Sequence, residues 1–110
     1  MPAKFELKKA KDGQFHFSLK ASNGEVILSS ELYKTKRSAL AGIASAQKNS
    51  PEAARYETKE SKNGKPYFVL KAANHQVIGQ SELYESAAAC ANGIKSVQKN
   101  GGAEKIEEIA

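Results

Sequence analysis

The side chains best suited to chemistry are few in this sequence. His16 and His75 lie at unrelated positions, one on an expected strand and one in an expected turn, so a transition-metal site, which gathers several ligands, is not predicted. Cys90 falls on the apolar side of an expected helix, where a buried, unreactive thiol is a simpler interpretation than a nucleophile. Neither histidine accompanies a recurring serine and carboxylate. The sequence therefore predicts no enzyme and no cofactor.

The chain is a tandem duplication. Ser-Glu-Leu-Tyr at 30–33 recurs at 81–84, and a shift of 51 residues aligns positions 5–50 with 56–101 without a gap. About 21 of the 46 aligned positions are identical, far more than chance produces. A half of about 50 residues is marginal on its own. We therefore expect one domain over 1–110, made of repeats at about 4–53 and 54–110 around a shared core.

Period-two alternation predicts strands at the start of each repeat. Residues 4–9, 15–21 and 26–30 alternate between apolar and polar types, and their counterparts 51 residues further on do much the same. The Asp-Gly and Asn-Gly pairs between them are typical of two-residue hairpin turns. Each repeat is predicted to contain a three-stranded antiparallel meander.

Helical periodicity follows the strands in each repeat. Thr35 and Ser86 are suitable N-caps, and behind them small and apolar residues recur at i, i+4 and i+7. The asparagines at 49 and 100 suit left-handed caps at the helix ends. Gly42 and Gly93 occupy equivalent places although a glycine within a helix costs about 1 kcal/mol. This coincidence indicates that each helix backbone lies close to the sheet.

Alternation returns after each helix. Lys105–Ile109 resembles the segment after the first helix, and that segment runs directly into the first strand of the second repeat at about 53–60. We therefore expect an α+β fold of two tandem β3-α-β repeats, with a single mainly antiparallel sheet, swapped C-terminal strands and both helices on one face. Because the duplication already supplies two units that would otherwise have to pair, we expect a monomer.

The repeated motifs resemble those of a known family. The Asn/Asp-Gly hairpin, Phe-x-Leu-Lys-Ala at 17–21 and 68–72, and Gly-Ile-x-Ser at 42–45 and 93–96 are similar to the YegP-like family of small bacterial proteins, over essentially the whole chain. The resemblance implies the exchanged-strand fold and a bacterial, cytosolic origin. It implies no activity, because the family is uncharacterised. Pro66 in place of Phe15 and Gly79 in place of Leu28 make the two halves unequal.

The composition bounds the possible partners. The formal charge is +5, and the surplus lies in the first repeat, where residues 1–53 carry nine Lys or Arg against five acids. Such a surplus attracts nucleic acid or other anions, although a solvated lysine-rich surface is the simpler interpretation. A single cysteine favours a reducing, cytoplasmic setting. No apolar run approaches the 18 or so residues of a membrane span.

The two identical Ser-Glu-Leu-Tyr segments have a structural and a functional interpretation. In the first, Leu32 and Leu83 fill the core, the tyrosines pack at the corner, and the glutamates favour the positive helix N-terminus. In the second, the tyrosines and glutamates line two symmetric grooves. We favour the structural interpretation.

The sheet face without helices is the candidate binding surface. If residues such as Phe5, Phe17, Leu19, Val26 and Leu28 point toward the helices, alternation selects the residues of the opposite face. The tentative binding residues there are Lys8, His16, Lys20, Ile27, Lys59, Tyr67, Lys71 and Ile78.

This face suits two kinds of partner. Exposed Ile27 and Ile78 favour contact with a protein. Lysines beside Tyr67 suit weak binding of single-stranded nucleic acid or another anion, by charge neutralisation and base stacking. We expect a non-enzymatic binding protein of unspecified partner, with a protein slightly favoured over nucleic acid.

Overall fold

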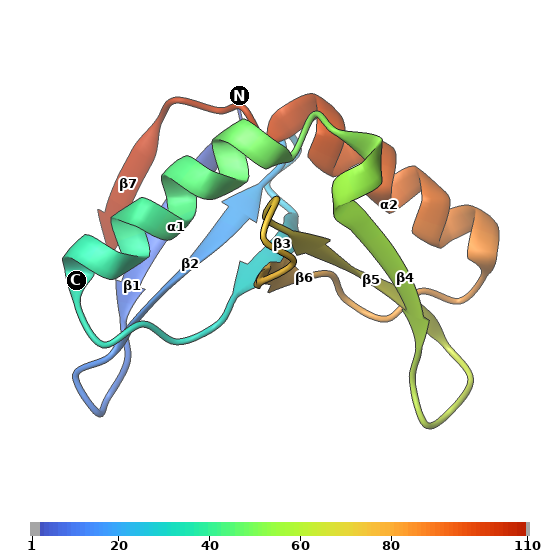
Figure 1. Ribbon diagram of the computed structural model, residues 1–110, viewed down its shortest axis with the longest axis horizontal. Helices are drawn as coiled ribbons and strands as arrows, with labels where there is room; N and C mark the ends of the chain where they lie inside the picture. The colour runs from blue at the N-terminus through green and yellow to red at the C-terminus, as the bar shows by residue number, and fades with distance from the viewer. Residues whose placement is uncertain (1–2, 110) are drawn as a thin grey trace.

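The computed structural model describes residues 3–109, which form seven strands, two helices and a 3-10 helix, η1 (Figure 1). The elements in chain order are β1 (Lys4–Lys9), β2 (Phe15–Lys20), β3 (Val26–Ser30), α1 (Lys36–Asn49), η1 (Ala53–Arg55), β4 (Tyr56–Glu60), β5 (Pro66–Lys71), β6 (Val77–Gln80), α2 (Ala87–Asn100) and β7 (Ile106–Ile109).

All seven strands belong to one sheet, in the order β4-β5-β6-β3-β2-β1-β7. Every neighbouring pair is antiparallel except β1 and β7, which are parallel. The repeats join where Ser29 of β3 pairs with Gln80 of β6, two residues 51 positions apart. The predicted α+β fold of tandem repeats in a single mainly antiparallel sheet is confirmed.

The terminal strand of each repeat lies on the sheet of the other. β7 comes from the second repeat but pairs with β1 of the first, where the Phe5 amide donates to the Lys105 carbonyl at 2.9 Å. β4 ends the first repeat and pairs with β5 of the second. β4 is therefore both the last strand of the first repeat and the first strand of the second. It forms one edge of the sheet, and β7 forms the other.

The hairpin turns differ from the expected two-residue form. In the first, the Gly13 amide donates to Ala10 at 3.0 Å, and the Ala10 amide donates to Gln14 at 2.7 Å. Only Gly13 has a positive φ, 87°, whereas a type I′ turn would require one at Asp12 as well. The connection is therefore a type I turn followed by one left-handed residue. The same bonding pattern recurs in the hairpins after Lys20, Glu60 and Lys71.

Both helices pack on the same face of the sheet and enclose a shared core (Figure 1). α1 contacts β2 of its own repeat and also β5 and β6, while α2 contacts β5 as well as β2 and β3. The largest buried side chains, among them Phe5, Phe17, Phe68 and Leu70, come from both repeats. Each repeat therefore completes the interior of the other.

The glycine within each helix allows close approach to the sheet, as predicted. A Cβ at Gly42 would lie 2.7 Å from Cζ of Tyr33 and 3.0 Å from Cε2 of Phe17. The rings of Tyr33 and Phe17 stack, with centroids 6.0 Å apart. Gly93 has the same relation to Tyr84 and Phe68. The two tyrosines of Ser-Glu-Leu-Tyr thus lie between helix and sheet, which confirms their predicted packing role.

The ends of the helices agree with the sequence only in part. Thr35 Oγ1 accepts the Ser38 amide at 3.0 Å, as expected of an N-cap. α1 ends at Asn49, but the following residue, Ser50, is right-handed with φ −59°. The expectation of a left-handed asparagine cap is wrong, because neither Asn49 nor Asn100 has a positive φ. The Asn49 side chain instead donates back to the Ser45 carbonyl at 2.9 Å, and α2 ends in the same way.

Candidate functional site

The uncovered sheet face carries a row of paired residues that crosses every strand. From the β7 edge to the β4 edge the row consists of Glu107, Glu6, Ser18, Ser29, Gln80, Val69 and Glu57. Lys8 pairs with His16 on one side of the row, and Lys59 pairs with Tyr67 at the equivalent place in the second repeat. Lys20 and Lys71 lie on the other side of the row. The structure thus brings six of the eight tentative binding residues to this face.

The other two tentative residues, Ile27 and Ile78, do not lie exposed on it. Ile78 is 4% exposed and belongs to the core, and Ile27 is half-buried against the core. The reason is a register shift in each repeat, which pairs Lys20 with Val26 and Lys71 with Val77 and leaves the isoleucine as the extra residue. The predicted exposure of these isoleucines is wrong. Val26, which was expected in the core, pairs instead with a residue of the uncovered face.

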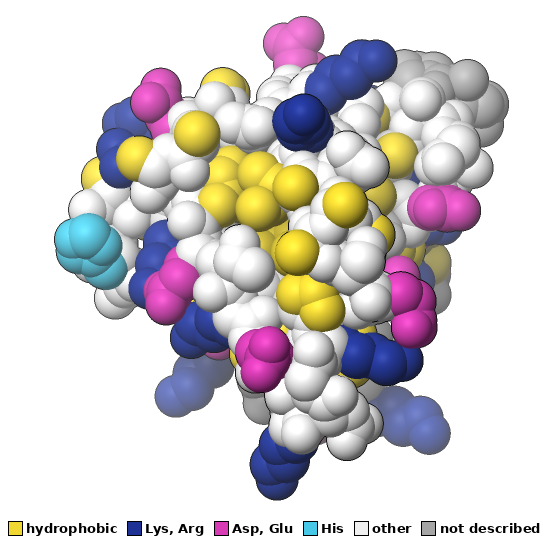
Figure 2. Space-filling view, turned by 90° about the vertical axis from the view of Figure 1, so that its right-hand side faces the viewer, with side chains coloured by type: hydrophobic (Ala, Val, Ile, Leu, Met, Phe, Trp, Pro, Cys, Tyr) yellow, Lys and Arg dark blue, Asp and Glu magenta, His cyan; other side chains and the backbone are white. Residues whose placement is uncertain are grey.

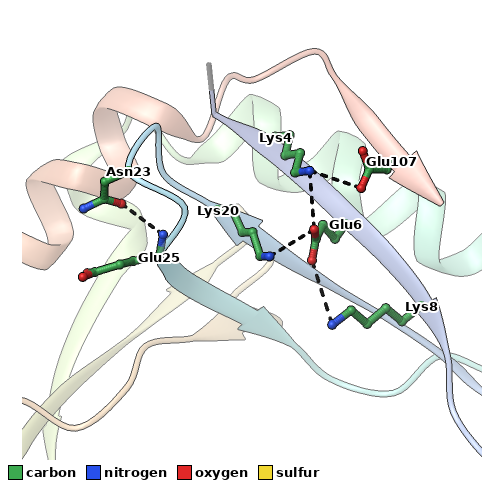
Figure 3. A network of polar contacts seen from close by, with 7 residues as sticks. All are labelled: Lys4, Glu6, Lys8, Lys20, Asn23, Glu25 and Glu107. Atoms are coloured by element: carbon green, nitrogen blue, oxygen red, sulfur yellow. Dashed lines mark hydrogen bonds and ion pairs between the residues drawn. The ribbon is translucent and has the colours of Figure 1, made fainter. Parts of the chain in front are cut away.

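Glu6 is the centre of a polar network on this face (Figure 3). It is only 5% exposed, and its carboxylate lies 3.1 Å from Nζ of Lys20, 3.6 Å from that of Lys4 and 3.9 Å from that of Lys8. Burial acts to raise the pKa of Glu6 and is the largest single influence, but the hydrogen bond and charges of the three lysines together outweigh it. The pKa of Glu6 is therefore below its usual range, and the group is ionised.

The second repeat has a more open version of this network. Glu57, the counterpart of Glu6, pairs with Lys71, and this hydrogen bond is the main cause that lowers its pKa. β4 has no further neighbour among residues 3–109, whereas β1 is covered by β7, which brings Glu107 within 3.1 Å of Lys4. The carboxylate of Glu57 is consequently far more exposed than that of Glu6.

A hollow lies beside each network, at the same place in both repeats. The first, of about 390 Å³, is lined by Lys4, Lys20, Lys105 and the hairpin turn at 21–24. The second, of about 150 Å³, is lined by five residues at equivalent positions, Ala54, Arg55, Lys71, Ala72 and His75, and also by Tyr56 and Glu57. Both hollows are therefore bordered by cationic side chains that come from the sheet and from the approach to its edge strand.

Sequence reasoning missed Glu6, Lys4 and Lys105 as members of this site. Glu6 recurs as Glu57, and each glutamate is flanked two residues away on both sides by a cation. Because alternate residues of a strand share a face, that spacing alone indicates a carboxylate between two cations. Lys105 offers no such signal, since its position depends on the exchange of β7.

The Ser-Glu-Leu-Tyr segments expose their leucines. Leu32 is 55% exposed and Leu83 is 51% exposed, so the expectation that they fill the core is wrong. The stacked tyrosine anchors each segment and leaves the preceding leucine outside. Cys90, by contrast, is buried as predicted, and burial raises the pKa of its thiol, which disfavours the reactive thiolate.

Residues 3–109 contain no group of three or more His, Cys, Asp or Glu side chains placed to hold a metal ion. None of the described helices has the length and apolar character needed to cross a membrane.

Comparison with known proteins places the chain in a family. The profile of a family described as "Domain of unknown function (DUF1508)" matches twice, at residues 10–57 and 61–108. The chain belongs to this family. The two DUF1508 matches agree with the duplication and confirm the resemblance to YegP-like proteins.

Relatives are similar over nearly the whole chain. The UPF0339 protein YegP of Yersinia pestis is 60% identical over 105 residues, which cover 96% of this chain and 94% of the relative. The protein of the same name from Escherichia coli is 55% identical over 104 residues, which cover 94% of each. These DUF1508 relatives are uncharacterised, so they bring no activity to this chain.

Solved structures show the same fold. The solution NMR structure of a UPF0339 protein from Shewanella oneidensis has a TM-score of 0.91 at 56% identity, over 98% of this chain and 92% of that one. The solution NMR structure of yegP from E. coli, described as a protein of unknown function, has a TM-score of 0.92 at 54% identity, over 98% and 93%.

Proposed function

We propose that this protein is a non-enzymatic binding protein that holds acidic side chains of a partner protein on its uncovered sheet face. The observation that carries the proposal is the recurrence of a cation-bordered hollow at equivalent places in both repeats. Lys20 and its counterpart Lys71 border the two hollows. A pair of related sites suits a partner that presents two carboxylate-bearing segments.

The charge at each hollow supports a carboxylate as the bound group. Three lysines border the first hollow, and the carboxylates of Glu6 and Glu107 pair with two of them, which leaves a surplus of one positive charge. The second hollow has Arg55 and Lys71 against Glu57, again a surplus of one positive charge among these three side chains. One surplus charge suits one carboxylate, whereas a nucleic-acid backbone repeats its charge and needs a continuous basic track.

Single-stranded nucleic acid is the second candidate, favoured by the neighbouring Lys59 and Tyr67 on the same face. A ring beside a cation can stack on a base and neutralise a phosphate. His16 and Lys8 are the equivalent pair in the first repeat. Two such pairs on a seven-stranded sheet make a sparse platform, so we rank this candidate below a protein partner. The free, buried Cys90 supports a cytoplasmic location for either partner.

The test compares two labelled probes by fluorescence anisotropy, an oligoglutamate peptide and an oligothymidine of similar length. We expect the oligoglutamate to bind more tightly and to weaken as salt rises. Lys20→Gln and Lys71→Gln should each lower its affinity about fivefold, since a surface ion pair contributes up to about 1 kcal/mol. Lys62→Gln, in an exposed hairpin turn, is the matched control and should leave binding unchanged.

Tighter binding of the oligothymidine would contradict the carboxylate proposal and favour nucleic acid as the partner. An equal loss of oligoglutamate affinity in all three lysine variants would indicate attraction by net charge without a specific site. If neither probe binds at low salt, the uncovered face does not hold anions.

A further inference from the structure

The edge strand β4 lacks the cover that its counterpart β1 receives. Phe5 and Leu7 of β1 are buried, whereas the equivalent Tyr56 is half-buried and Thr58 is exposed. The difference extends to the helices, because Ile43 of α1 is fully buried while the equivalent Ile94 of α2 is only half-buried. Figure 2, which faces the side of α2 and β4, shows hydrophobic side chains gathered at its centre among charged groups.

A strand like β7 does not suit this edge. The Tyr56 amide already donates to the Ala53 carbonyl of η1, whereas the equivalent Phe5 amide donates to the Lys105 carbonyl and so binds the segment that leads into β7. Glu108 of β7 is held by Lys36, and the residue equivalent to Lys36 in the second repeat is Ala87. The apolar Leu7, which lies opposite Glu108 in the β1–β7 pairing, is replaced by Thr58. The features that position a parallel strand beside β1 are therefore absent beside β4.

The backbone groups that remain open on β4 are those of alternate residues. Glu57 and Lys59 lie on the uncovered face, opposite Val69 and Tyr67 of β5. By analogy with Phe5 on β1, the main-chain groups of Tyr56, Thr58 and Glu60 point away from the sheet. Of these groups, the Tyr56 amide is already bonded to the Ala53 carbonyl. Thr58 is the middle residue of the strand, so its open amide and carbonyl can form a reciprocal pair with the same groups of an identical strand.

We propose that β4 binds β4 of a second copy, antiparallel, about a twofold axis through Thr58. This register places Glu57 opposite Lys59 of the other copy, twice by symmetry, so that both contacts are between opposite charges. Glu57 and Lys59 would form non-hydrogen-bonded pairs, and in an antiparallel sheet the side chains of such pairs lie closest together. No ion pair within residues 3–109 engages Lys59. The edge is thus self-complementary in the reciprocal hydrogen bonds of Thr58 and in the charges of Glu57 and Lys59, as a twofold contact requires.

The expected monomer concerned a different contact. It followed from the duplication, which supplies two units within one chain and so makes a second copy unnecessary for completing the core. Pairing through β4 leaves that core intact and joins two complete sheets edge to edge. Because the contact involves one strand of five residues, it belongs to the small, reversible class of interfaces.

The experiment measures association of the full chain by sedimentation velocity over a wide concentration range. The wild-type protein should dimerise reversibly as its concentration rises, and added salt should weaken the dimer. Glu57→Lys and Lys59→Glu should each raise the dissociation constant about tenfold, because both cross-strand pairs become repulsive. Lys62→Glu, which makes the same charge change outside the strand, should have little effect.

An equal mixture of the two single variants gives the sharpest result. In the mixed dimer every contact again joins a lysine and a glutamate, so the dissociation constant should return close to the wild-type value although each variant alone dimerises about tenfold more weakly. Recovery on mixing also shows that both variants are folded. The proposal is overturned if the wild type stays monomeric at the highest concentration, if Lys59→Glu dimerises as well as the wild type, or if mixing restores nothing.

Discussion

His75 holds a left-handed backbone conformation, φ 71°, that glycine holds in the other three hairpins. A side chain in this conformation costs about 1–2 kcal/mol, partly offset because glycine loses more backbone entropy on folding. We expect His75→Gly to raise the free energy of unfolding by about 0.5–1 kcal/mol in urea titrations. The reciprocal change at the equivalent position, Gly24→His, should lower it by a similar amount. Equal stability of both variants and the wild type would show that His75 is not strained.

Leu32 and Leu83 differ in their surroundings from every other leucine that recurs between the repeats. Both are about half exposed, while Leu19 and its counterpart Leu70 are buried. Leu32→Ser and Leu83→Ser should therefore change the free energy of unfolding by less than about 0.5 kcal/mol. Leu19→Ala should cost about 2–5 kcal/mol as the buried control. A large loss in either serine variant would mean that the exposed leucine packs more tightly than its exposure indicates.

The misplaced isoleucines show what alternation can and cannot predict. Strict alternation along β3 assigned Ile27 to the uncovered face. That assignment fails because side chains alternate strictly only while the pairing with the neighbouring strand is regular. The extra residue beside Lys20 changes the phase, and a bulge depends on the partner strand as well as on local sequence. Leu28 was placed correctly in the core because it lies on the other side of the bulge, opposite Leu19.

Glu6 couples β1 to β2 and, through Lys4, to β7. Because the lysines hold the folded pKa of Glu6 below its usual range, the unfolded chain takes up a proton at higher pH than the folded one. Ionised Glu6 thus stabilises the fold fully above about pH 5, and this contribution is lost as the pH falls through the lower folded value.

Urea unfolding of the wild type and Glu6→Gln across pH 3–7 tests this coupling. We expect the wild type to be the more stable at pH 7 and the difference to shrink steadily below pH 5. Glu57→Gln should show a smaller difference at pH 7, because Glu57 is exposed and pairs with a single lysine. A difference for Glu6→Gln that stays constant with pH would exclude ionisation as its source.

The elements themselves were largely predictable, and their edges less so. The three strands, the helix and the following strand of each repeat are each indicated by a local sequence pattern, and the duplication repeats every pattern at a second position. Exchange of β7 followed from the continuity between α1 and β4. The contrast within residues 3–109 between β1, which β7 covers, and β4, which has one neighbour, was not predicted, because it depends on which of two equivalent strands receives β7.

The repeats share one interior, which determines how the molecule unfolds. α1 lies against β5 and β6, α2 lies against β2 and β3, and β7 of the second repeat covers β1 of the first. Neither repeat can therefore open without exposing apolar surface of the other. This interlocking favours a single cooperative transition for the whole chain.

Leu19→Ala tests whether stability is shared across the repeat boundary. The substitution lies in β2, so a protein of two independent halves would lose stability only in β1–β3 and α1. A single interlocked core predicts that amide hydrogen exchange of β5 and α2 accelerates as much as that of β2, because all these amides exchange through the same global opening. The measurement is native-state hydrogen exchange by NMR, with Leu70→Ala as the mirror variant in the second repeat. Unchanged protection of β5 in Leu19→Ala would show that the second repeat is stable without the first, despite the strand that it lends.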